Sequence, residues 1–178
     1  QTYYWKIRAN DGFEDVDSAI KQLIVFDSPV RSWSHRCGGG ISSVSMSSDG
    51  KYIAAGCLDD NVYLFGQDAR NLLWTSDTGN NDVISVAISA DGKYIAAGTA
   101  DSTGSSSKVY LFDKDSSTPL WNYTTGGSAR VAISADGEYI VAGTGYNDKK
   151  IYLFDKDSST PLWSYTVGYS VGTVAISA

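Results

Sequence analysis

Short apolar runs separated by polar turns recur along this chain, and one pattern is written three times. Each copy has an apolar run, a Ser-x-Asp-Gly turn, two further runs of the Tyr-Ile-Ala-Ala-Gly and Tyr-Leu-Phe type, and a closing Leu-Trp pair. Short apolar runs bounded by turn residues are typical of β-strands joined by hairpins. The chain is therefore predicted to be all-β.

The Asp-Gly pairs give the period of the repeat, because their spacing is 42 and then 45 residues. Asp-Gly favours a two-residue hairpin turn, since both positions tolerate positive φ. A period in the low forties, built from short strands, is typical of a β-propeller with four-stranded blades. The turn residues are predicted to be structural in every copy: Asp49, Gly50, Asp91, Gly92, Asp136 and Gly137.

We expect a partial propeller over residues 29–178, with about three complete blades and flanking strands. The predicted blades are residues 41–77, 83–124 and 130–166. The strand that carries Trp33 is expected to be a lone fourth strand before the first complete blade. Residues 171–178 begin a further copy, so we expect the chain to be a segment of a longer protein.

Residues 1–28 do not follow the repeat. Alternating apolar residues in TYYWKIRA predict one strand, an Asp-Gly turn follows, and AIKQLIVF predicts a second strand. This pair resembles the last two strands of a fibronectin type III or related immunoglobulin-like domain. The resemblance implies the C-terminal piece of a β-sandwich ahead of the propeller.

The repeat itself, with its Val-Ala-Ile-Ser-x-Asp-Gly and Val-Tyr-Leu-Phe-Asp runs, resembles the WD-repeat pattern. The signature Trp-Asp is replaced by Phe-Gly or Phe-Asp, as at Phe112 and Asp113. The Leu-Trp-Ser-Tyr strand is also similar to quinoprotein-type propellers. Prokaryotic surface proteins often combine such propellers with fibronectin-like modules, so the resemblance implies an extracellular or cell-surface location.

The tryptophans recur at one position per repeat, which predicts packing between neighbouring blades. They are Trp33, Trp74, Trp121 and Trp163. Cys37 precedes the first blade and Cys57 follows its second strand. Both positions are expected on the same face of the propeller, where a disulfide is feasible and would fit an oxidising compartment. The alternative is two unrelated small residues, since Cys57 aligns with Thr99 and Thr144.

The loop between the second and third strands varies most among the repeats, and variable loops are where binding residues concentrate. The alternative is a solvated loop without a ligand. The candidate partner-binding residues in these loops are Asp59, Asp60, Asp101, Tyr146, Asn147 and Asp148.

The chain has 14 Lys and Arg against 20 Asp and Glu, a net charge of −6. Nucleic-acid binding requires a basic surface, so none is predicted. No apolar run approaches the roughly 20 residues of a membrane-spanning helix. The sequence has one histidine, His35, and neither a Gly-x-Ser-x-Gly turn nor a phosphate-binding loop. We therefore expect no catalytic, cofactor or metal site.

These features favour a non-catalytic binding or adhesion module that presents propeller loops to a protein or glycan partner. One alternative is a propeller enzyme, a quinone-dependent dehydrogenase or a hydrolase, whose active residues lie outside this segment. Another is an intracellular scaffold.

Overall fold

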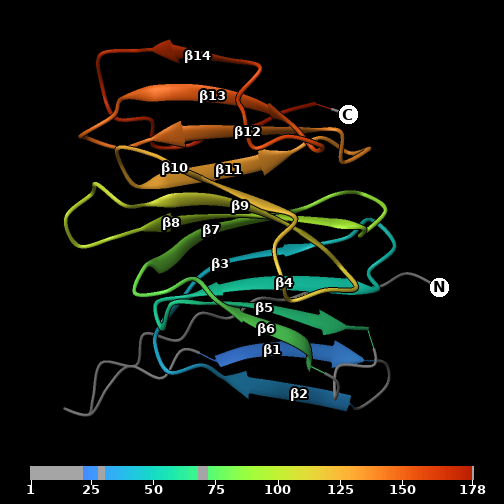
Figure 1. Ribbon diagram of the computed structural model, residues 1–178. Helices are drawn as coiled ribbons and strands as arrows, with labels where there is room; N and C mark the ends of the chain where they lie inside the picture. The colour runs from blue at the N-terminus through green and yellow to red at the C-terminus, as the bar shows by residue number, and fades with distance from the viewer. Residues whose placement is uncertain (1–21, 28–30, 68–71, 178) are drawn as a thin grey trace.

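The computed structural model describes residues 22–27, 31–67 and 72–177, with side chains from Ser34 onward. Three four-stranded antiparallel sheets follow one another in chain order and are stacked one above another in Figure 1. The first sheet consists of β3 (Ile41–Met46), β4 (Tyr52–Cys57), β5 (Asn61–Gly66) and β6 (Leu72–Asp77). The second consists of β7 (Asp82–Ile88), β8 (Tyr94–Ala100), β9 (Lys108–Asp113) and β10 (Trp121–Thr124). The third consists of β11 (Ala129–Ile133), β12 (Tyr139–Thr144), β13 (Lys150–Asp155) and β14 (Trp163–Thr166).

Within each sheet the strands lie side by side in chain order. This arrangement is the four-stranded antiparallel blade of a β-propeller. The predicted all-β fold, a partial propeller, is confirmed, and we call the three sheets the first, second and third blades.

The N-terminal strands differ from the expectation. β1 (Gln22–Asp27) pairs antiparallel with β2 (Arg31–Arg36), so that Gln22 lies opposite Arg36 and Asp27 opposite Arg31. The strand that carries Trp33 is therefore not alone. β1 and β2 have the pairing of the third and fourth strands of a blade, as β9 and β10 do. Residues 1–21 of the proposed sandwich module lie outside the described residues.

The core lies between blades. One cluster joins Leu64 of the first blade to Val83 and Phe112 of the second, and all three side chains are 0% exposed. A second cluster joins Leu111 of the second blade to Phe154 of the third. Because each blade buries its face against the next, the stability of the array depends on contacts between neighbours.

Glycine at the end of the second strand permits this packing. A Cβ atom added at Gly56 would lie 2.7 Å from Val83 Cγ1, and one added at Gly98 would lie 2.9 Å from the carbonyl carbon of Ala129. The first strand of the next blade crosses these glycines so closely that no side chain fits between them.

The recurring tryptophans bridge blades. Trp74 Nε1 donates to the backbone oxygen of Lys114 at 2.7 Å, and Trp121 Nε1 donates to that of Lys156, also at 2.7 Å. The ring of Trp121 lies 5.3 Å from that of Phe154. Trp163, on the last strand, is 49% exposed. The side chain of Trp33 lies outside the described part of the chain.

The Asp-Gly turns are built alike in all three blades. In the second blade Ser89 Oγ donates to Asp91 Oδ1 at 2.6 Å, and the Tyr94 amide donates to Ser89 Oγ at 3.0 Å. Gly92 has φ +75°, and a Cβ there would strike the ring of Tyr52 in the preceding blade. Equivalent bonds hold the other two turns, which contain Asp49, Gly50, Asp136 and Gly137.

Candidate functional site

The topology gathers the variable loops on one end of the blades, which we call the loop face. In an antiparallel blade the loop after the second strand and the link after the fourth strand leave from the same end. The loop face comprises residues 58–60, 78–81, 101–107, 125–128, 145–149 and 167–170.

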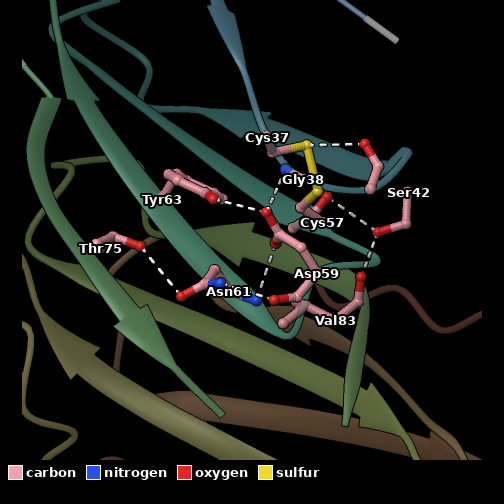
Figure 2. Close-up of a disulfide and its surroundings, with 11 residues drawn as sticks. Cys37, Gly38, Ser42, Cys57, Asp59, Asn61, Tyr63, Thr75 and Val83 are labelled. Carbon is pink, nitrogen blue, oxygen red and sulfur yellow. Dashed lines mark hydrogen bonds between the residues drawn. A yellow bond between two sulfur atoms is a disulfide. The ribbon is translucent and has the colours of Figure 1, made fainter. Parts of the chain in front are cut away.

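Cys37 and Cys57 form a disulfide at one corner of the loop face, with a Cα–Cα distance of 6.7 Å (Figure 2). The bond ties the link between β2 and β3 to the end of β4. Cys57 is 0% exposed. Both cysteines line a small apolar depression together with His35, Ile41, Ala55, Tyr63 and Phe65.

Asp59 lies beside the disulfide and is held by three donors. Its Oδ2 atom accepts from the Gly38 amide at 2.7 Å and from the Tyr63 hydroxyl at 2.8 Å (Figure 2). Its Oδ1 atom accepts from the Asn61 amide at 3.2 Å. Burial, and then the hydrogen bond to the Asp59 carboxylate, raise the pKa of Tyr63 well above its usual range. The Asp59 carboxylate therefore connects the β2–β3 link, at Gly38, to β5, at Tyr63.

Two sulfur atoms and one carboxylate oxygen thus converge here. The ligand atoms of Cys37, Cys57 and Asp59 all lie within 4.8 Å of one another. Because the two sulfur atoms are bonded to each other in the disulfide, the three side chains could hold a metal ion only after reduction. The sequence predicted no metal site, because it has no Cys-x-x-Cys spacing and a single histidine, His35.

Asp101 is engaged within its own loop. It accepts hydrogen bonds from the Thr103 and Ser106 side chains and, at 2.8 Å, from Ser107 Oγ. Burial would raise its pKa, but the hydrogen bonds from these residues outweigh burial and lower the pKa well below its usual range. The carboxylate therefore organises its own loop.

Asp148 repeats the arrangement of Asp59 in the third blade. Its Oδ2 atom accepts from the Tyr152 hydroxyl at 2.8 Å, and its Oδ1 atom lies 3.6 Å from Lys150 Nζ. The Asp148 side chain is 8% exposed. The structure therefore places Asp148 in the interior of its loop.

Tyr146 and Asn147 lie at the surface of the same loop. Tyr146 is 81% exposed, and Lys149 Nζ lies 5.3 Å from the centre of its ring. Asn147 Nδ2 donates to the Thr103 oxygen at 3.2 Å and so joins the loops of the second and third blades. A second exposed tyrosine, Tyr169, is 83% exposed in the link after β14. The sequence analysis missed Tyr169, although it stands where the earlier links have Gly or Asn.

Asp60 is an acidic residue of the loop face with a perturbed pKa. Burial raises its pKa, and the nearby carboxylates of Asp82, Asp77 and Asp59 raise it further. Within the described residues, no ion pair neutralises Asp60, Asp77 or Asp82. This part of the loop face therefore carries uncompensated negative charge.

The comparisons with known proteins agree on the fold. A family model described as "WD40: WD domain, G-beta repeat" matches residues 27–65 and 71–113. The solved "Structure of U3-55K" is 14% identical, with a TM-score of 0.68, and the alignment covers 80% of this chain and 44% of that one. The "Crystal structure of RRP9 WD40 repeats" is 15% identical, with a TM-score of 0.67, and covers 80% of this chain and 43% of that one. No curated protein matches the chain.

The chain therefore contains a segment of a WD-repeat-like β-propeller. It spans less than half the length of the two solved chains that it resembles. WD40 propellers typically act as scaffolds for protein interaction and bind protein partners. In the described residues, no helix is long and apolar enough to cross a bilayer.

The expected extracellular or cell-surface location is contradicted. That expectation depended on a sandwich module before the propeller, but the family match already begins at residue 27 and is to WD40 repeats. The similar solved structures are likewise WD40 propellers, U3-55K and RRP9. Moreover, β1, which was assigned to the sandwich, pairs with β2.

Proposed function

We propose that this chain is part of a non-catalytic scaffold that binds a protein partner on its loop face, with Tyr146 as the main anchor. The observation that carries the proposal is the exposure of the Tyr146 ring, 81%, on the loop face of the third blade. Tyrosine is enriched in the centres of protein interfaces, where its ring supplies apolar area and its hydroxyl a hydrogen bond.

The charge of the loop face favours a partner with basic side chains. The carboxylates around Asp60 lack an ion-pair partner among the described residues, and burial followed by repulsion from these carboxylates raises the pKa of Asp60. A lysine or arginine of the partner would relieve that repulsion. The remaining candidates, Asp59, Asp101 and Asp148, are engaged in intramolecular hydrogen bonds, so we assign them to loop structure.

The intramolecular hydrogen bonds of these three aspartates favour a binding role for the loop face over a catalytic role. An acid–base site needs a carboxyl or imidazole group that is free to exchange a proton with a bound substrate. Asp59, Asp101 and Asp148 are instead fixed by hydrogen bonds from within their own blade or its entry link.

Site-specific photo-crosslinking tests this proposal. A photoreactive phenylalanine analogue is placed at position 146 or at Leu120, which is 52% exposed and lies at the opposite end of the blades. We expect one discrete protein to be crosslinked from position 146 and not from position 120. Equal crosslinking from both positions, or none from position 146, would contradict the proposal.

A further inference from the structure

We propose that, when its disulfide is reduced, the Cys37–Cys57 corner is a binding site for a thiophilic divalent metal ion such as Zn²⁺, with the two thiolates and the Asp59 carboxylate as ligands. The primary observation is that a carboxylate oxygen of Asp59 lies within 4.8 Å of both sulfur atoms, which the disulfide holds together. Zinc accepts thiolate and carboxylate ligands at about 2.0–2.3 Å in tetrahedral geometry, so its ligand atoms lie about 3.5 Å apart. Reduction breaks the S–S bond and allows the two sulfur atoms to separate to that spacing.

A comparison between blades shows what is particular to this corner. Cys37 opens the Cys-Gly-Gly-Gly link, where the next two links open with Thr78 and Thr125. Cys57 ends its strand where Thr99 and Thr144 stand in the other blades. Both sulfur atoms therefore replace hydroxyl groups of a conformation that the first and third blades share. The fold does not require cysteine at either position.

The threonines show what the shared conformation needs. Thr125 Oγ1 donates to the Gly127 oxygen at 2.7 Å, and Thr144 Oγ1 accepts from the Lys150 amide at 2.9 Å. Cys37 Sγ lies 3.1 Å from the Gly39 oxygen, the acceptor equivalent to that of Gly127. A reduced Cys37 thiol can donate to this oxygen, so the corner accommodates the dithiol without rearranging its link.

The carboxylate is already oriented. The Gly38 amide and the Tyr63 hydroxyl both hold Asp59 Oδ2, and supporting hydrogen bonds of this kind fix the ligands of metal sites. The same Asp–Tyr pair occurs in the third blade, as Asp148 and Tyr152. Orientation of the carboxylate is thus a property of the fold, and the first blade adds the two sulfur ligands.

The chemistry proceeds in two steps. A dithiol reductant breaks the S–S bond, delivers two electrons and two protons to the sulfur atoms, and becomes a disulfide itself. The metal ion then displaces one proton from each thiol and binds both thiolates and the carboxylate. Water or an exogenous ligand takes the fourth position, as in zinc sites with three protein ligands.

Cobalt(II) titration of the reduced protein tests the site. The disulfide is reduced anaerobically with a phosphine, which is oxidised to its phosphine oxide with oxygen from water. Binding is followed by the thiolate-to-cobalt charge-transfer absorption. We expect one ion per chain, and we expect Zn²⁺ to abolish the band because zinc binds such ligands more tightly than cobalt.

Two variants make the test specific. Cys37→Thr/Cys57→Thr installs the threonine pair of the third blade, and circular dichroism confirms that it is folded. We expect no charge-transfer band from this variant. Asp59→Asn should weaken cobalt binding at least tenfold. Absence of the band in the reduced wild-type protein, an equal band in the threonine variant, or unchanged affinity in Asp59→Asn would each overturn the proposal.

Discussion

The corners of the first and third blades share one backbone arrangement and differ in the chemistry of two side chains. In each corner an aspartate accepts from the hydroxyl of a tyrosine four residues later, at 2.8 Å, and packs against a glycine of the entry link. In the first blade a disulfide ties that link to the second strand. In the third blade Thr125 and Thr144 occupy the same two positions and bind backbone groups.

This difference separates what the fold requires from what is specific to one blade. The aspartate–tyrosine pair serves the propeller, because it recurs where no cysteine is present. The cysteines are specific to the first blade. Their disulfide ties down the β2–β3 link, which connects the β1–β2 pair to the rest of the array. Substitutions that convert one corner into the other therefore test the comparison directly.

The largest effect is expected from removing the disulfide. Cys37→Ala/Cys57→Ala should lower the free energy of unfolding by about 3 kcal/mol, because the bond closes a loop of moderate length in the unfolded chain. Cys37→Thr/Cys57→Thr should lose about 2 kcal/mol, since the hydroxyls recover part of the loss through hydrogen bonds. Urea unfolding of the oxidised protein and both variants measures these differences. A threonine variant less stable than the alanine variant would break the equivalence of the two corners.

The next effect concerns the tyrosine hydroxyls. Tyr152→Phe leaves the largely buried Asp148 carboxylate without its hydroxyl donor and should cost about 2 kcal/mol. Tyr63→Phe should cost about 1 kcal/mol, because the disulfide and the Gly38 amide still hold the first corner. Urea unfolding of the two single variants gives the comparison. Equal losses would show that the disulfide does not support the aspartate–tyrosine pair.

Alkaline pH should weaken both corners together. Burial and the neighbouring aspartate raise the pKa of Tyr63 and Tyr152 in the folded protein. The unfolded chain therefore loses these protons first, and stability declines as pH rises above about 10, the ordinary pKa of tyrosine. Unfolding at pH 9 to 11 should show a smaller decline in a Tyr63→Phe/Tyr152→Phe variant. An identical decline in stability in the wild-type protein and in the variant would contradict the raised pKa of Tyr63 and Tyr152.

The smallest effect on stability is expected at the proposed interface. Tyr146→Ala should change the free energy of unfolding by less than about 0.5 kcal/mol, because the ring is 81% exposed. Partner binding should be lost in the same variant. Thermal unfolding, measured beside the crosslinking experiment, separates a binding residue from a structural one. A large loss of stability would place Tyr146 with the structural tyrosines.

The sequence was sufficient for the blades and their turns. Short apolar runs, Asp-Gly turns and the recurring Leu-Trp pairs determine local strand pairing, which each repeat encodes independently. The position of β1 was not predicted, because the alternating residues before it suggested a separate sandwich. A usable signal was present: LIVFD at 23–27 resembles IYLFD at 151–155, the third strand of a blade.

The candidate site was predicted only in part. The cysteines and the variable loops were identified, but the intramolecular hydrogen bonds of Asp59 and Asp148 were not predicted. The inward orientation of the two carboxylates depends on a tyrosine hydroxyl four residues later, at Tyr63 and Tyr152. That spacing is visible in the sequence. Whether the hydroxyl reaches back to the carboxylate depends on the curvature of the loop, which the apolar pattern does not determine.

Transfer of the cysteine pair from the first corner to the third tests the equivalence of the corners most directly. Thr125→Cys/Thr144→Cys is introduced into the Cys37→Thr/Cys57→Thr protein, which is then oxidised with a glutathione redox buffer and denatured for a thiol assay. If the two corners share one backbone arrangement, the new cysteines pair and no free thiol remains. Two free thiols per chain, in a protein that was folded during oxidation, would contradict the account.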